Sequence, residues 1–202
     1  MDSNKTKIYQ EDPLNVILIY ICLGLTPIYK FILNIFRIPL RYGPNILTTI
    51  SLFIGLYSVY NVYNLKYIEG GFLFFLAYIF DVWDGLFARK YKAVTMIGDY
   101  YDHICDGVKI TLLLFVILFS KDIEINFKIA FVLIFSVLGI LTLWHLGCHQ
   151  KHYKNRTHKE MLDGLKKLCK HEKDIKYSRF FGEGMIMFYM SIFIIYLGCR
   201  NI

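Results

Sequence analysis

The sequence predicts an all-α, polytopic membrane protein with about six transmembrane helices and an interfacial amphipathic helix. The first observation is the composition: 56% of the 202 residues are hydrophobic, and the mean hydropathy is +0.44. The second is the distribution of the charged residues, because these 19% gather in stretches between long apolar runs. The runs are continuous and not alternating, which favours helices over the strands of a barrel.

Six apolar runs carry this prediction. Most are long enough, at about 1.5 Å per residue, to cross a hydrocarbon core of roughly 30 Å. Pro27 and Lys30 interrupt the first run, so its second half either crosses the membrane with the rest or lies in the interface; we favour crossing. The runs cover approximately residues 14–36, 46–63, 71–88, 99–120, 127–147 and 184–198.

The interfacial helix is predicted over residues 158–176, where apolar residues such as Leu162, Leu165 and Leu168 recur at helical spacing among many charges. A solvated basic linker is the alternative. We treat residues 1–202 as a single membrane domain, with a polar N-terminal tail over 1–13 and a cytoplasmic basic segment over 150–181. The tail lacks the pattern of a signal peptide.

Basic residues alternate with the apolar runs in a way that predicts the orientation. They lie between the first and second runs, between the third and fourth, and most densely between the fifth and sixth. Since positive loops stay in the cytoplasm, these three stretches are predicted to be cytoplasmic. The net charge of +7 is therefore interpreted as membrane orientation and not as nucleic-acid binding.

The cysteines predict no disulfide framework, because they are odd in number and scattered: Cys22, Cys105, Cys148, Cys169 and Cys199. A zinc site is a second hypothesis for part of this set. It would use His145, Cys148, His149 and His152, but no Cys-x2-Cys pair accompanies them, so a cytoplasmic helix end rich in histidine is the favoured interpretation.

The residues that indicate chemistry lie in the stretch DVWDGLFARKYKAVTMIGDYYDHICD, which begins at Asp81 and ends at Asp106. Asp81 and Asp84 are three residues apart and share a helix face, as do Asp102 and Asp106, which are four apart. A short basic turn separates the pairs, so they can face each other. Carboxylates at membrane depth usually mark function, and two facing pairs suit hard divalent cations. Asp99 is interpreted as a solvated residue at a helix start.

The spacing D-x2-D-G-x2-A-R-x8-G-x3-D-x3-D resembles the signature of the CDP-alcohol phosphotransferases. A second element upstream, Pro44-Asn45-Ile46-Leu47-Thr48, is similar to the Pro-Asn-x-x-Thr element that opens the first core helix of these enzymes. Together the two elements cover roughly residues 40–120. All eight fixed positions of the signature are filled, by Asp81, Asp84, Gly85, Ala88, Arg89, Gly98, Asp102 and Asp106.

The resemblance implies a homodimeric integral membrane enzyme that binds a CDP-linked substrate and two divalent ions, Mg²⁺ or Mn²⁺. The basic loops predict that this site lies at the cytoplasmic face. Asp81, Asp84 and Asp102 would be metal ligands, and Asp106 would be the general base and also a metal contact. The residues implied to contact the CDP group are Asn45, Thr48, Gly85, Ala88, Arg89, Thr95 and Gly98.

Three basic residues of the cytoplasmic segment, Lys151, Lys154 and Arg179, are candidate contacts for a phosphorylated acceptor. Attachment of the cytoplasmic face to anionic lipid is the alternative role for each of them.

The resemblance leaves the direction of transfer open. We favour transfer of a phosphatidyl group from CDP-diacylglycerol to a small alcohol, with release of CMP. The stretch Asp102-His103-Ile104-Cys105-Asp106 resembles an element of the choline and ethanolamine enzymes, which transfer phosphocholine or phosphoethanolamine to diacylglycerol, although Ile104 replaces a glycine there.

A cation transporter or channel subunit is the alternative from another class. It is disfavoured because the carboxylates lie near one face of the membrane and the sequence shows no internal repeat.

Overall fold

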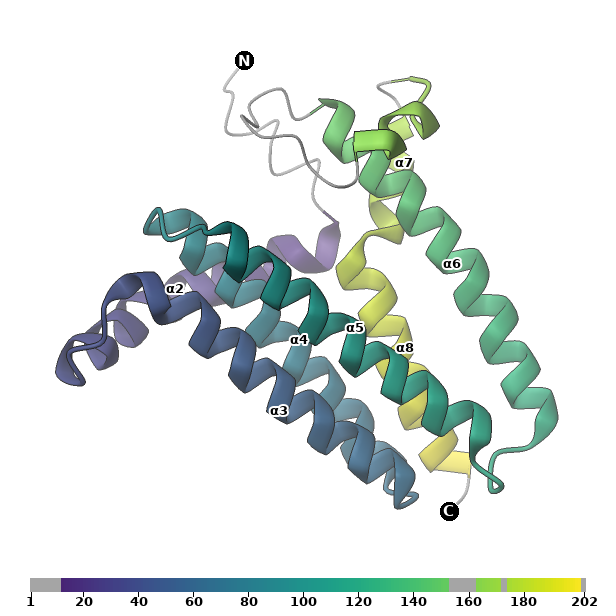
Figure 1. Cartoon of the computed structure of the whole chain (residues 1–202). Coiled ribbons are helices and arrows are strands. Elements are labelled where there is room, and N and C mark those ends of the chain that lie inside the picture. The colour runs from purple at the N-terminus through teal and green to yellow at the C-terminus, as the bar shows by residue number, and fades with distance from the viewer. Residues whose placement is uncertain (1–11, 153–162, 172–173, 201–202) are drawn as a thin grey trace. The chain divides into compact units, whose positions relative to one another are not determined.

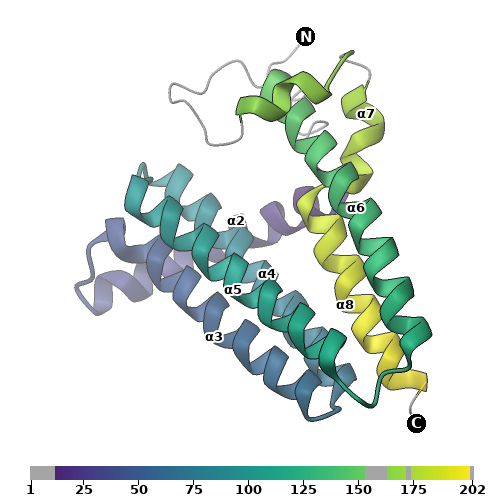
Figure 2. The ribbon, with the colours of Figure 1, turned by 45° about the vertical axis from the view of Figure 1, so that its right-hand side comes forward.

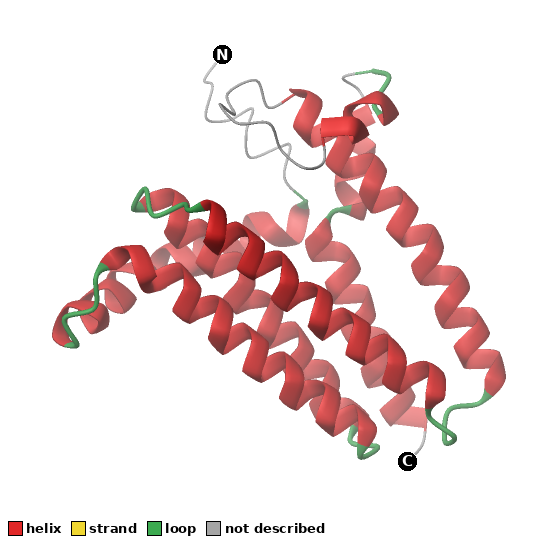
Figure 3. Cartoon of the chain, viewed as in Figure 1, coloured by secondary structure: helices red, strands yellow, loops and turns green. Residues whose placement is uncertain are grey.

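A computed structural model of the chain describes residues 12–152, 163–171 and 174–200. In this part of the chain the elements are helices joined by short turns, as Figures 1 and 3 show. Each long helix coincides with one of the six apolar runs, so the predicted all-α fold is confirmed. The six are α2 (Pro13–Ile35), α3 (Gly43–Tyr63), α4 (Tyr67–Lys90), α5 (Met96–Phe119), α6 (Ile125–His152) and α8 (Glu183–Arg200).

Five candidate membrane spans are long and apolar enough to cross a bilayer, and α6 is the most apolar of them. The best window of α6 has a mean hydropathy of 2.3, yet only 17% of it is buried inside the protein. Such a surface is stable in lipid and not in water. The helix α5 is the exception among the six long helices, because it carries three aspartates and Lys109. The helix α2 continues through Pro27 without a break.

The described residues divide into two compact units. The larger unit contains residues 17–124 and the end of α8 from residue 190 onward. The smaller unit contains the residues before position 17 together with residues 125–189.

In the larger unit, α4 and α5 both pack against α3, as the two ribbon views show (Figures 1 and 2). The close approach of α3 to α4 depends on Gly70, whose missing side chain leaves room for Val62. Ser58 of α3 also donates a hydrogen bond of 2.7 Å to the carbonyl oxygen of Gly70. Small residues and hydroxyl groups at such contacts let helix backbones approach closely in membranes.

The helix α2 is attached to this unit by an aromatic cluster. Tyr29 packs its ring against Phe87 of α4, with ring centroids 5.1 Å apart, and its hydroxyl donates to the carbonyl oxygen of Gly43, 2.9 Å away. Trp83 of α4 donates from Nε1 to the hydroxyl oxygen of Thr26, 3.2 Å away. These contacts hold the C-terminal half of α4, which carries two of the aspartates.

In the smaller unit, Asp12 caps two helices at once. Its Oδ1 accepts a hydrogen bond from the backbone N–H of Asn15 in the first turn of α2, 2.8 Å away. Its Oδ2 accepts from the backbone N–H of Gly184 in the first turn of α8, 3.1 Å away. Gly182 allows this approach, because a side chain there would overlap Asp12. An acidic side chain is favoured at both helix starts.

The segment between α6 and α8 differs from the single amphipathic helix predicted over residues 158–176. Part of that range lies outside the described residues. The described part forms two separate helical stretches, η2 (Asp163–Leu168) and α7 (Asp174–Ser178), and a third turn, η3 (Arg179–Phe181), precedes α8. The backbone of η2 packs directly against α6 at Leu165. This close approach is possible because Gly147 of α6 has no side chain.

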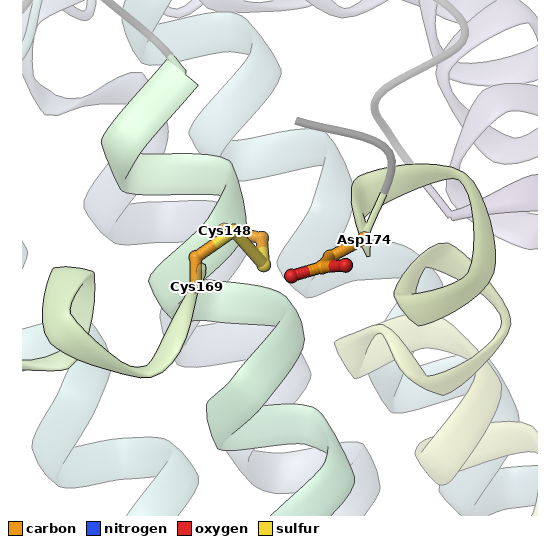
Figure 4. A group of neighbouring side chains, drawn as sticks. All are labelled: Cys148, Cys169 and Asp174. Carbon is orange, nitrogen blue, oxygen red and sulfur yellow. A yellow bond between two sulfur atoms is a disulfide. The ribbon is translucent and has the colours of Figure 1, made fainter. Parts of the chain in front are cut away.

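A disulfide joins Cys148 of α6 to Cys169 just after η2 (Figure 4). The expectation that the sequence contains no disulfide is therefore wrong for this pair. Both sulfurs are buried, and Ile175 and Trp144 pack against them. The two cysteines are 21 residues apart and no spacing rule links them, so their pairing depends on the fold that returns the chain to α6.

We expect the change of Cys169 to serine to lower the thermal unfolding midpoint of the purified protein under non-reducing conditions. Closing a loop of this length stabilises a fold by about 3 kcal/mol, because it restricts the unfolded chain. Differential scanning fluorimetry in detergent measures the midpoint. The matched control is Cys199→Ser, which removes a free, exposed thiol. Equal midpoints for the two variants would show that the disulfide does not support the unit.

Candidate active site

The turn between α4 and α5 brings the two aspartate pairs together. Thr95 caps the start of α5, and its Oγ1 accepts a hydrogen bond from the backbone N–H of Gly98, 3.0 Å away. On the other side of the turn, the backbone N–H of Ala93 donates to the carbonyl oxygen of Ala88, 2.8 Å away. Hydrogen bonds therefore hold the turn at both of its ends. The turn joins the last turns of α4 to the first turns of α5 at one end of the larger unit.

Three of the four carboxylates converge on one point. Asp81, Asp102 and Asp106 each offer an oxygen atom, and these atoms lie within 4.8 Å of one another. In the described part of the chain, Oδ1 of Asp102 is buried and has no hydrogen-bond partner. A buried oxygen without a partner is unfavourable unless a ligand satisfies it. An all-carboxylate donor set with such an oxygen fits a hard divalent cation such as Mg²⁺ or Mn²⁺.

Asp84 lies outside this group of three, although Asp81 and Asp84 are both fixed aspartates of the signature. It is 4% exposed, and its Oδ2 accepts a hydrogen bond of 2.6 Å from the hydroxyl of Thr48 on α3. The Asn45-to-Thr48 element and the aspartate signature are thus in direct contact, across 36 residues of sequence. A metal-ligand role for Asp84 stays a prediction.

Lys109, one turn after Asp106 on α5, supplies a positive charge to the same group. Its Nζ lies 2.6 Å from Oδ1 of Asp106 and 3.3 Å from Oδ1 of Asp81, and it donates to the hydroxyl oxygen of Ser51, 2.7 Å away. The lysine side chain is 6% exposed. Its ammonium group therefore partly neutralises two of the carboxylates, of which Asp81 is 18% and Asp106 32% exposed.

The residues implied to contact CDP fall into two places. Oδ1 of Asn45 and Oγ1 of Thr95 lie against Gly98, and a β-carbon there would meet them at 3.0 and 2.9 Å. On α4, the guanidinium of Arg89 folds back over Gly85, where a β-carbon would lie 3.2 Å from one of its nitrogens. Their contact with a nucleotide stays a prediction, as does that of Ala88.

Asp99 does not join the site. Its carboxylate is 72% exposed and lies 3.9 Å from Nδ1 of His103, which also hydrogen-bonds to the carbonyl oxygen of Asp99. This agrees with the interpretation of Asp99 as a solvated residue at a helix start.

Of the candidate acceptor residues, Lys151 and Arg179 belong to the smaller unit, and the role of all three stays a prediction. Lys151 donates from Nζ to the carbonyl oxygen of Cys169, 2.6 Å away, and Arg179 lies over the ring of Phe180 at 6.0 Å. Lys154 lies outside the described residues.

The zinc hypothesis loses its cysteine ligand. Cys148 is bonded to Cys169, and a metal would need the thiolate form of the sulfur. Asp174 points toward this disulfide (Figure 4), but its Oδ2 accepts a hydrogen bond from the backbone N–H of His171, 2.9 Å away. His145 contacts Ser178 through Nδ1 at 3.2 Å. The side chain of His152 lies outside the described part of the chain.

The sequence reasoning missed Lys109 and its neighbours Ser51 and Gly55. A signal was present, since a lysine inside an apolar run, one turn after an aspartate, is expected to pair with a carboxylate. Ser51 and Gly55 gave no such signal, because small residues are common on membrane helices.

Comparisons with known proteins show the family of this chain. The family model for CDP-alcohol phosphatidyltransferases matches residues 41–198, and the chain therefore belongs to that family. A protein of Dictyostelium discoideum described as an uncharacterized CDP-alcohol phosphatidyltransferase class-I family protein 2 is 32% identical over 99 residues. That match covers 44% of this chain and 24% of the relative, so the chain spans about a quarter of it. No solved structure matches the chain.

We expect Thr48→Val to destabilise the protein, because valine keeps the shape of threonine and removes the hydrogen bond to the buried carboxylate of Asp84. Leaving such a group without its partner costs about 1–3 kcal/mol. The thermal unfolding midpoint of the metal-free protein in detergent is the measurement. Thr111→Val, at an exposed position of α5, is the control. A midpoint for Thr48→Val equal to that of the control would show that the contact does not stabilise the fold.

Proposed function

We propose that the protein transfers a phosphatidyl group from CDP-diacylglycerol to a small alcohol, with a divalent metal ion and release of CMP. The observation that carries this proposal is the group of three carboxylate oxygens from Asp81, Asp102 and Asp106, within 4.8 Å of one another, in a chain of the CDP-alcohol phosphatidyltransferase family. Divalent ions held there, Mg²⁺ or Mn²⁺, would neutralise charge on the pyrophosphate and on the leaving CMP.

Each of the four aspartates has a proposed role in the reaction. Asp81, Asp84 and Asp102 are the proposed metal ligands, and Asp106 is proposed both to contact the metal and to act as the base. Asp106 accepts the proton of the acceptor hydroxyl, whose oxygen then bonds to the phosphorus distal to cytidine. The bond from that phosphorus to the bridging oxygen breaks, and CMP leaves with the bond electrons. A carboxylate beside the attacking hydroxyl provides this base catalysis.

The nucleotide half of the donor is proposed to bind beside Asn45, Thr95 and Arg89, whose polar groups can form hydrogen bonds. Gly98 leaves room for the side chains of Asn45 and Thr95, and Gly85 leaves room for the guanidinium of Arg89. Arg89 is suited to a phosphate, because its guanidinium is planar and always charged. Thr48 acts in this scheme through Asp84, to which it donates.

Phosphocholine or phosphoethanolamine transfer to diacylglycerol is the second candidate, and His103 with Cys105 between two aspartates favours it. The cytoplasmic location of the site and assembly as a homodimer are proposed from the loop charges and the family resemblance. They stay predictions.

We expect the purified protein to release CMP from CDP-diacylglycerol only when both a divalent ion and a small alcohol are present. The assay follows labelled CMP with Mg²⁺ or Mn²⁺ and with glycerol 3-phosphate, inositol, inositol phosphate or serine as acceptor. CDP-choline or CDP-ethanolamine with diacylglycerol is tested in parallel. Release in the parallel arm alone would reverse the direction of transfer. No release in either arm, together with cation flux in liposomes, would contradict the proposal.

We expect Asp106→Asn to reduce kcat by at least about a hundredfold, because the amide cannot accept the proton. Mn²⁺ binding should persist, since the amide oxygen and the other carboxylates remain. Turnover and Mn²⁺ binding are measured on the same preparation. The control is Asp99→Asn, whose exposed carboxylate lies outside the site and whose turnover should match that of the unmodified protein. Normal turnover by Asp106→Asn would exclude Asp106 as the base.

A further inference from the structure

Lys109 contacts the carboxylates of the site, but neither the signature nor the proposed mechanism uses it. Its three strongest contacts, to Asp106, Asp81 and Ser51, lie at 2.6, 3.3 and 2.7 Å. An ammonium group has three N–H donors, so these contacts satisfy it completely. Two of the three partners are carboxylates of the group proposed to hold the metal.

The position of the ammonium is also fixed by contacts of the lysine with α3. The aliphatic part of the lysine lies against Gly55 of α3, where a β-carbon would come within 2.5 Å of Cδ and 2.8 Å of Cγ. Ser51, one turn earlier on α3, is itself held by a hydrogen bond of 2.9 Å to the carbonyl oxygen of Ala77 on α4. The lysine thus occupies a slot formed by α3.

We infer that Lys109 is a fixed internal cation that makes the binding of divalent metal depend on the pyrophosphate of the donor. The inference rests on the proposed function in one respect, namely that these carboxylates hold a metal ion. Lys109 acts through the carboxylates and is a positioning residue in this scheme.

The charges explain the dependence. The ammonium offsets negative charge on Asp81 and Asp106, the two carboxylates it contacts, and it repels a metal ion that binds to the same carboxylates. Between two cations only a few ångströms apart, such repulsion weakens metal binding. A bound pyrophosphate adds negative charge and offsets the repulsion. Metal ion and pyrophosphate therefore strengthen each other's binding, and the effect is reciprocal.

The test measures metal binding directly and does not depend on turnover. Free Mn²⁺ is titrated into the detergent-solubilised protein and followed by electron paramagnetic resonance, with and without saturating CDP as the pyrophosphate probe. The variants are Lys109→Met, which removes the charge, and Lys109→Gln, which removes the charge and keeps hydrogen-bond donors. The control is Lys121→Gln, which removes an exposed lysine beyond the C-terminal end of α5.

Without CDP, both Lys109 variants should bind Mn²⁺ at least about tenfold more tightly than the unmodified protein, because the repulsion is gone. The gain in Mn²⁺ affinity that CDP produces should shrink by a similar factor. The Lys121 variant should behave like the unmodified protein. If Lys109→Met does not fold, Lys109→Gln decides the outcome, since the inference depends on charge and not on the shape of the side chain.

The outcomes separate the inference from the proposed function. If the unmodified protein binds Mn²⁺ and the Lys109 variants bind it with equal or lower affinity, the inference is overturned while the proposed metal site stands. If CDP fails to strengthen Mn²⁺ binding in the unmodified protein, the inference is likewise overturned. If neither the unmodified protein nor any Lys109 variant binds Mn²⁺, the proposed metal site fails, and the inference fails with it.

Discussion

The neutralisation of carboxylates inside an apolar helix bundle is the constraint on which the rest of this structure depends. Four aspartates lie at the junction of α4 and α5, and an ionised carboxylate in such a setting is unstable unless something pairs with it. The aspartates differ in the groups that pair with them. Thr48 donates to Asp84, and Lys109 pairs with Asp81 and Asp106. Asp102 keeps a buried oxygen without a hydrogen bond in the described part of the chain, which leaves that position for a ligand.

The helix α3 makes this arrangement possible, although it carries none of the four aspartates. Along one face it presents Thr48 to α4, then Ser51 and Gly55 to the lysine of α5. Thr49, on the same helix, lies 3.0 Å from the hydroxyl of Tyr101, a neighbour of Asp102. The helices that hold the carboxylates are therefore positioned by polar contacts to a third helix, in addition to apolar packing. In membranes, where apolar packing alone gives little preference between partners, such contacts specify which faces meet.

The four aspartates also differ in the groups that surround them. A carboxylate that accepts from a buried threonine is held in one orientation, whereas three oxygens that face a common point can be shared by a cation. Asp106 belongs to the second kind and also contacts the lysine. These differences come from the neighbours of each residue. They are not visible in the signature, where all four positions carry the same letter.

The sequence by itself determined the helices and the stretch in which the four aspartates lie. Apolar runs fix helices because a backbone in lipid must satisfy its own hydrogen bonds, and each long helix lies where a run was predicted. The spacing of Asp81 with Asp84 and of Asp102 with Asp106 fixed which carboxylates share a face. Only the tertiary structure decided the contacts between distant residues: Thr48 with Asp84, Lys109 with Ser51, Cys148 with Cys169, and Asp12 with the first turn of α8. Each of these depends on how one helix is rotated against another, and the order of residues along a single helix carries no record of that rotation.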